Sequence, residues 1–86
     1  MQNVLTIGEA VYDILFQNSK PVDAKVGGSM LNVAVSLARA GVSVGFCGSI
    51  ANDDIGTEMI RFLMENNVDK SYLKVIDSAK SNVALA

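Results

Sequence analysis

Short apolar runs and helix-like repeats alternate along this chain. Residues 4–7 form an apolar run with β-branched side chains, which is typical of a strand covered on both faces. Residues 11–16 are a weaker extended segment, and the polar residues 17–21 predict a turn. Apolar and charged side chains then alternate over residues 22–26, as in a strand with one face exposed to water. The pattern therefore predicts a hairpin within residues 14–26 that lies outside the main sheet.

Two segments have the spacing of helices. Residues 30–40 are predicted to form the first helix, with Ser29 as its N-cap and Gly41 directly after its end. The second helix is predicted to begin at residues 52–54, where acidic side chains suit the positive end of the helix dipole, and to stop at Asn67. Three further segments are predicted strands: residues 42–47, 72–76 and 82–85.

The order of these elements predicts an α/β fold with parallel strands. Ligands of such sheets bind beyond the carboxyl ends of the strands. Asp13 and the diglycine at residues 27–28 each follow an extended segment. We therefore expect Asp13 and the diglycine to face one cleft.

The composition indicates that the domain extends beyond these residues. Half of the 86 residues are hydrophobic and 19% are charged, which is more apolar material than so short a chain buries easily. Residues 83–86 are an apolar run without a polar tail. We therefore expect residues 1–86 to be the amino-terminal fragment of one larger domain. Open strand edges are expected at residues 42–47 and 83–85.

Charge and cysteine content exclude several classes of function. The net charge is −2 and the seven lysines and arginines are scattered, which argues against a nucleic-acid partner. No membrane span or signal peptide is evident, so we expect a soluble, cytoplasmic protein without a membrane partner. The sequence has no histidine and a single cysteine, Cys47, so the usual zinc sites cannot form. Asp53 and Asp54 are interpreted as helix caps rather than metal ligands.

The diglycine is the strongest candidate for ligand contact. Gly27 and Gly28 allow the backbone unusual conformations and let a ligand approach without meeting a Cβ atom, while the following helix directs free N–H groups toward the turn. The amide of Asn32, in the first helical turn, both donates and accepts. A tight turn before a core helix is the alternative interpretation. Asn32 also shares a polar stripe with Ser36 and Arg39, which is equally consistent with a solvated helix face.

The order of these pieces resembles the amino-terminal part of the ribokinase-like, pfkB-type carbohydrate kinases. The opening strand ends in Gly8-Glu9, Asp13 follows, and residues 27–34 match the Gly-Gly-x-x-x-Asn-x-Ala element of the family. The resemblance continues through residues 37–41, 45–50 and 65–69, with Asp53 and Gly56 between them. The chain departs from the family at Ala51, where glycine is usual, and at Met30, where a small residue or proline is usual. Met30 is therefore expected to reshape the sugar pocket.

The resemblance implies a partial α/β sandwich core with a small β-sheet lid. Its lid strands are expected within residues 14–26 and from about residue 82. The same resemblance implies that a sugar is held by five residues, with Gly27 also acting as a hinge: Asp13, Gly27, Gly28, Ser29 and Asn32.

The implied function is that of an ATP-dependent sugar kinase, closest to the fructokinases and ketodeoxygluconate kinases. A nucleoside kinase of the same fold and a non-catalytic sugar-binding or dimerisation module are the alternatives. The full enzyme is expected to use ATP and Mg²⁺ and to form a homodimer through the lid strands. In the family, the nucleotide site and the catalytic Asp lie in a later Gly-Ala-Gly-Asp element that this sequence lacks. The chain alone is therefore expected to bind neither nucleotide nor metal and to be inactive.

Overall fold

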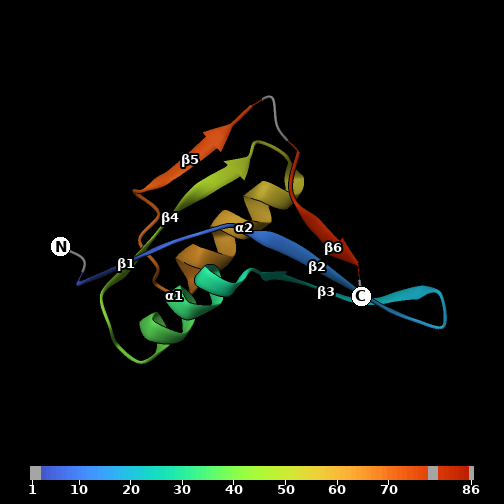
Figure 1. Ribbon diagram of the computed structural model, residues 1–86, viewed down its shortest axis with the longest axis horizontal. Coiled ribbons are helices and arrows are strands. Elements are labelled where there is room, and N and C mark those ends of the chain that lie inside the picture. Colours follow the sequence, from blue (N-terminus) through green and yellow to red (C-terminus); the bar gives the residue numbers. More distant parts are fainter. Residues whose placement is uncertain (1–2, 78–79, 86) are drawn as a thin grey trace.

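Two separate three-stranded sheets and two helices make up residues 3–77 and 80–85, the part of the chain that this computed structural model describes (Figure 1). The elements follow one another as β1 (Val4–Ile7), β2 (Val11–Gln17), β3 (Lys20–Gly27), α1 (Ser29–Arg39), β4 (Val44–Ala51), α2 (Asp54–Glu65), β5 (Leu73–Ile76) and β6 (Val83–Leu85).

The larger sheet has the order β1-β4-β5 and is parallel throughout. The first half of β4 pairs with β1, and its second half, from Gly48 to Ala51, pairs with β5. The predicted α/β class is therefore confirmed. Because β4 lies in the middle of the sheet, the open edge expected at residues 42–47 was wrong, and the strand continues past residue 47 because β5 provides a second partner.

Both helices cover the same face of this sheet. Alternate side chains of β4 point into a single core that α1 and α2 complete, and Phe46 at its centre is 0% exposed. The opposite face of the sheet leaves Leu5 and Ile7 exposed. The largest fully buried side chains are those of Phe46, Leu31, Met59, Leu63 and Val44.

The smaller sheet has the order β3-β2-β6 and extends to the right of the core in Figure 1. β2 and β3 form an antiparallel hairpin, and β6 pairs in parallel with β2 over residues 12–14. Asn18 and Ser19 both have positive φ, 54° and 62°, which is the geometry of a two-residue hairpin loop. The turn is therefore shorter than the predicted 17–21, and both strands run longer.

The start of α1 differs from the prediction. Gly28, at φ 112°, is the N-cap, and Ser29 is already the first helical residue. No side chain caps this helix, so the predicted capping role of Ser29 was wrong: the diglycine turn starts the helix one residue earlier. The helix ends as predicted before Gly41, which has φ 90°.

α2 has a side-chain cap at its first turn. The carboxylate of Asp53 accepts a hydrogen bond from the backbone N–H of Gly56 at 2.7 Å. Asn67 ends the helix with φ 61°, as predicted. Within the described residues, neither helix is long and apolar enough to cross a membrane.

Candidate functional site

Asp13 lies inside β2 rather than after a strand as predicted, because β2 continues through this residue to Gln17. It is half-buried, pairs with Lys25 of β3 on one side and lies opposite Ala84 of β6 on the other. A sheet rather than a loop therefore holds this carboxylate, which fixes its position more firmly.

Gly27, the last residue of β3, leaves room for the side chain of Asp13. A Cβ atom at Gly27 would collide with Oδ2 of Asp13. Gly27 and Lys25 lie on the same face of the hairpin as Asp13, because side chains alternate along each strand. The missing side chain thus lets the Asp13 carboxylate lie over the end of β3.

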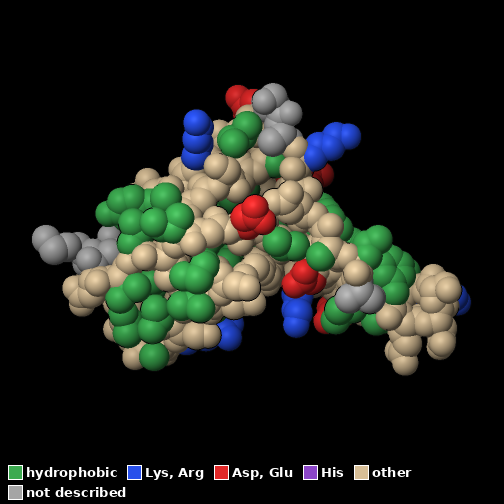
Figure 2. Space-filling view, in the orientation of Figure 1, with side chains coloured by type: hydrophobic (Ala, Val, Ile, Leu, Met, Phe, Trp, Pro, Cys, Tyr) green, Lys and Arg blue, Asp and Glu red, His purple; other side chains and the backbone are tan. Residues whose placement is uncertain are grey.

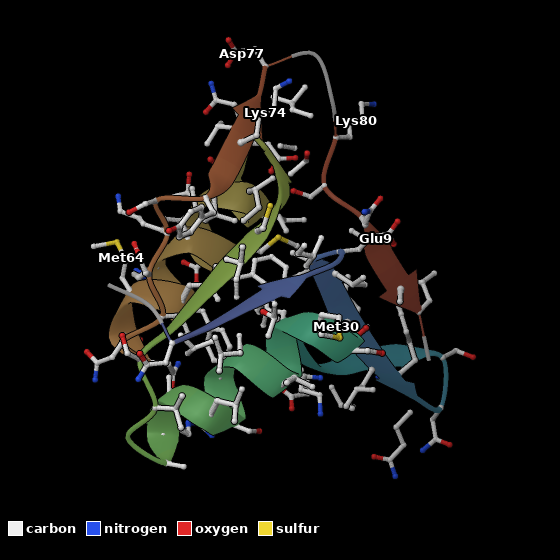
Figure 3. The ribbon with its side chains drawn as sticks, turned by 60° about the vertical axis from the view of Figure 1, so that its left-hand side comes forward. Glu9, Met30, Met64, Lys74, Asp77 and Lys80 are labelled. Carbon is white, nitrogen blue, oxygen red and sulfur yellow. The ribbon has the colours of Figure 1, made fainter. Side chains whose placement is uncertain are left out.

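Gly28 brings two chain connections into direct contact. A Cβ atom at Gly28 would collide with the carbonyl oxygen of Glu9, and the φ of 112° disfavours any other residue. We call this place the crossing: residues 8–10, which join β1 to β2, pass against residues 27–28, the last residue of β3 and the single residue between β3 and α1. Met30 also lies here at the start of α1 (Figure 3), where its Cβ atom would be 2.7 Å from a Cβ built on Gly8.

A cavity of about 370 Å³ lies between the hairpin and α1. Three of the predicted sugar-binding residues line it together: Asp13, Gly27 and Asn32. Gly28 and Ser29 are not among its lining residues, because Gly28 is in the crossing and Ser29 is exposed in the first turn of α1. The predicted common cleft is thus formed by strand and helix side chains rather than by the turn itself.

The polar stripe of α1 contributes to this cavity. Ser36 and Arg39 line it beside Asn32, so the stripe is solvated and also lines the cavity that Asp13 lines. Nε of Arg39 donates to Oδ1 of Asn66 at 2.8 Å, which ties the far end of the stripe to the end of α2.

Lys25 is a lining residue that the sequence analysis did not identify. The signal was present in the hairpin register, which sets Lys25 opposite Asp13 once the loop is placed at residues 18–19. The cavity therefore combines a carboxylate, two cationic side chains, an amide and a hydroxyl. Such a mixture of donors and acceptors suits a ligand that carries several hydroxyl groups.

The amino-terminal end of α1 lies beside the same diglycine. No acidic residue occurs in its first turn and no side chain caps it, so its N–H groups retain capacity for an external acceptor. Within residues 3–77 and 80–85, no group of three or more acidic, cysteine or histidine side chains is placed to hold a metal ion.

Comparison with known families extends over the whole chain. The sequence profile of the pfkB family carbohydrate kinases matches residues 1–86. The fructokinase of Escherichia coli is 39% identical over 71 residues, which cover 83% of this chain and 23% of that protein. The 5-dehydro-2-deoxygluconokinase of Geobacillus kaustophilus is 39% identical over 61 residues, 71% of this chain and 18% of that protein. The aminoimidazole riboside kinase of Salmonella typhimurium is 32% identical over 75 residues, 87% of this chain and 24% of that protein.

Solved structures agree with these relatives. A fructokinase from Xylella fastidiosa with bound ATP superimposes with a TM-score of 0.90 at 31% identity, over 95% of this chain and 26% of that one. A fructokinase from Vibrio cholerae O395 in a form with fructose, ADP and calcium bound gives a TM-score of 0.90 at 28% identity, over 99% of this chain and 28% of that one. The chain thus spans about a quarter or less of the length of the curated relatives it matches.

The crossing predicts different losses of stability when two glycines with positive φ, Gly28 and Gly41, are replaced. Gly41 has φ 90° and no atom within 4 Å of a Cβ built on it. Gly41→Ala should therefore lower the free energy of unfolding by about 1 kcal/mol. Gly28→Ala adds a collision with the backbone at Glu9 and should cost at least about 2 kcal/mol. Urea unfolding followed by circular dichroism measures both variants. Equal losses would show that the two connections do not constrain each other.

Proposed function

Because this chain belongs to the pfkB family of carbohydrate kinases, we propose that it is the sugar-binding part of an ATP-dependent kinase that transfers the γ-phosphoryl group of ATP to a sugar hydroxyl. The observation that carries the proposal is the convergence of Asp13, Gly27 and Asn32 on one cavity from three different elements. Relatives named fructokinase and 5-dehydro-2-deoxygluconokinase favour a hexose-derived substrate.

Each residue has a distinct proposed role. The carboxylate of Asp13 accepts hydrogen bonds from two neighbouring sugar hydroxyls, and the amide of Asn32 both donates and accepts. Gly28 and Ser29 lie outside the cavity lining, at the uncapped start of α1 beside it, and are proposed to provide backbone N–H groups to the part of the sugar that extends beyond the cavity. Gly27 leaves space for the Asp13 carboxylate and acts as the hinge between the two sheets.

The smaller sheet is proposed to act as a lid. It shares no strand with the larger sheet and carries Asp13 on its central strand. Closure over the sugar would exclude water, so that the phosphoryl group is transferred to the sugar instead of being lost to hydrolysis.

We propose that ATP and Mg²⁺ are not held by the residues that the structure describes. The first turn of α2 is already occupied by the Asp53 carboxylate, and the described residues form no cluster of metal-ligating side chains. The nucleotide, the metal and the catalytic base are therefore proposed to be held by residues beyond position 86 in a longer kinase, and the location of that kinase is proposed to be the cytoplasm.

The isolated 86 residues are therefore expected to phosphorylate no sugar, because transfer requires a positioned nucleotide and a base for the acceptor hydroxyl. A coupled assay for ADP release with the purified chain tests this. Sugar-dependent ADP formation would contradict the proposal that the nucleotide site and the catalytic base lie outside these 86 residues.

A nucleoside kinase is the second candidate, favoured by the similarity to aminoimidazole riboside kinase. A screen of sugars and nucleosides with the kinase that contains this chain separates the two, with ADP release as the readout. Phosphorylation of a nucleoside alone would decide for the second candidate. Turnover with neither class would favour a non-catalytic binding or dimerisation module.

Asp13→Asn in that kinase should reduce kcat/KM for the sugar at least about tenfold, which corresponds to 1.4 kcal/mol. The amide keeps the shape of the side chain but loses the charge and one acceptor. The KM for ATP should stay within about twofold, because the nucleotide binds elsewhere.

Asp23→Asn is the matched control. Asp23 lies on the same hairpin but does not line the cavity, and its carboxylate accepts from the backbone N–H of Ala24 at 2.8 Å. This variant should leave sugar kinetics unchanged. Normal sugar kinetics in folded Asp13→Asn would remove Asp13 from the site.

A homodimer through the smaller sheet is also proposed. Hydrophobic side chains gather over this sheet on the right in Figure 2, and Val22 and Leu85 are 57% and 69% exposed. Such an apolar surface beside the open edge of β6 favours pairing with a second copy. Leu85→Lys should weaken the dimer at least about tenfold in analytical ultracentrifugation.

The control for this prediction is Val33→Lys, which places the same charge on an exposed apolar position of α1 rather than of the smaller sheet. It should leave the dimer intact. A parent protein that sediments as a monomer at all concentrations, or equal effects of the two variants, would rule out this interface.

A further inference from the structure

Asn52 and Asp53, in the turn between β4 and α2, form hydrogen bonds with residues near both ends of the connection from β5 to β6. Nδ2 of Asn52 donates to Oδ1 of Asp77 at 2.8 Å. Oδ2 of Asp53 accepts from the backbone N–H of Ser81 at 2.9 Å, and its Oδ1 accepts from the Ser81 hydroxyl at 2.5 Å. Asp77 directly follows β5 of the larger sheet, and Ser81 lies two residues before β6 of the smaller sheet, on the same side of the gap as Lys80 (Figure 3), so this turn of the core holds the described residues at both ends of the connection.

The carboxylate of Asp53 makes hydrogen bonds to two different parts of the fold. It caps α2 through the N–H of Gly56, and it holds Ser81. The hydrogen bonds from Ser81 and Gly56 favour the ionised form and lower the pKa of Asp53 below its ordinary value. The anionic carboxylate therefore joins the start of a core helix to the start of the smaller sheet's edge strand.

Ser81 directly precedes the contacts that join β6 to β2. The carbonyl oxygen of the next residue, Asn82, accepts from the N–H of Tyr12 at 2.8 Å. β6 then continues in parallel with β2, and Ala84 lies opposite Asp13. The partner of Asp53 is thus three residues from the position that flanks Asp13.

We propose that Asp53 is a positioning residue for the sugar site. Its carboxylate fixes where β6 joins the smaller sheet, and the paired β6 in turn holds the strand that carries Asp13. Asp53 is not among the residues that line the cavity with Asp13, so it acts through β6 rather than on the ligand. The inference rests on the proposed function for its effect on sugar use, whereas the attachment of β6 is a property of the fold.

The test uses Asp53→Asn in the kinase that contains this chain. Asparagine is as good an N-cap as aspartate, so the bond from Gly56 is retained. An amide has a single acceptor oxygen, so it cannot also receive both donors of Ser81. Because Oδ1 accepts from both Gly56 and the Ser81 hydroxyl, an amide oxygen in its place keeps the helix cap and the hydroxyl bond, and the variant loses the bond from the Ser81 N–H. Ser81→Ala removes the hydroxyl bond from the other side.

Two readouts report on the two parts of the inference. Hydrogen exchange of the Tyr12 amide should accelerate roughly tenfold in Asp53→Asn, because its acceptor on Asn82 is then held less firmly. The KM for the sugar should rise roughly tenfold, because a small displacement of a binding group has a large effect on its interaction with substrate. The KM for ATP and the midpoint of urea unfolding should change little. The double variant should exceed either single variant in both readouts, since each single variant leaves one of the two bonds between residues 53 and 81 in place.

Thr57→Ala is the matched control. Its hydroxyl donates to the backbone carbonyl of Asp53 at 3.1 Å, so its loss perturbs the same helix turn without touching the carboxylate. It should leave both readouts unchanged. Unchanged Tyr12 exchange in Asp53→Asn, or faster exchange with an unchanged sugar KM, would overturn the inference.

An equal rise of the KM values for sugar and ATP together with a lower unfolding midpoint would also overturn it, because that is the result of a helix cap alone. If the parent kinase phosphorylates neither sugars nor nucleosides, the proposed function fails. The Tyr12 exchange rate then decides separately whether Asp53 holds β6.

Discussion

The contact between Gly28 and the carbonyl oxygen of Glu9 is the constraint on which the two-sheet arrangement depends. The chain leaves the larger sheet after β1 and returns to the face of that sheet at α1. The outgoing and the returning segment both pass through this crossing. A side chain there would separate them. With the two backbones in contact, the hairpin projects from one fixed point, and Asp13 comes to lie within the same cavity as the first turn of α1.

The hydrophobic core of the larger sheet also stabilises the crossing, because it holds the start of α1 in place. β4 pairs with β1 and with β5 in succession, and its alternate side chains are buried by both helices. Phe46 and Leu31 are both fully buried in that core, so α1 is packed firmly where its first turn must face the hairpin. Rigid packing of this kind is what allows an exposed polar stripe, including Asn32, to keep a defined orientation.

Elements with strong local patterns were predictable from the sequence. The short apolar strand at residues 4–7 and the left-handed stop at Asn67 depend on neighbouring residues alone, and the structure has both. The family was likewise predicted from motif spacing and is confirmed by the profile match. Ser29 was misassigned because a capping pattern does not reveal that the diglycine turn already closes the helix start. Lys25 beside Asp13 required the hairpin register, which depends on the exact position of the loop, and Ser81 beside Asp53 required a tertiary contact that no local pattern encodes.

The parallel pairing of β6 with β2 has a consequence for the order of folding. The β2–β3 hairpin is local in sequence and can form within microseconds, whereas β6 reaches β2 only after the segment between them has folded back through β4, α2 and β5. Closing that long loop costs entropy before any β6 contact repays it. The smaller sheet therefore acquires its third strand late, and a newly made chain presents Asp13 on an incomplete two-stranded ribbon until the core has formed.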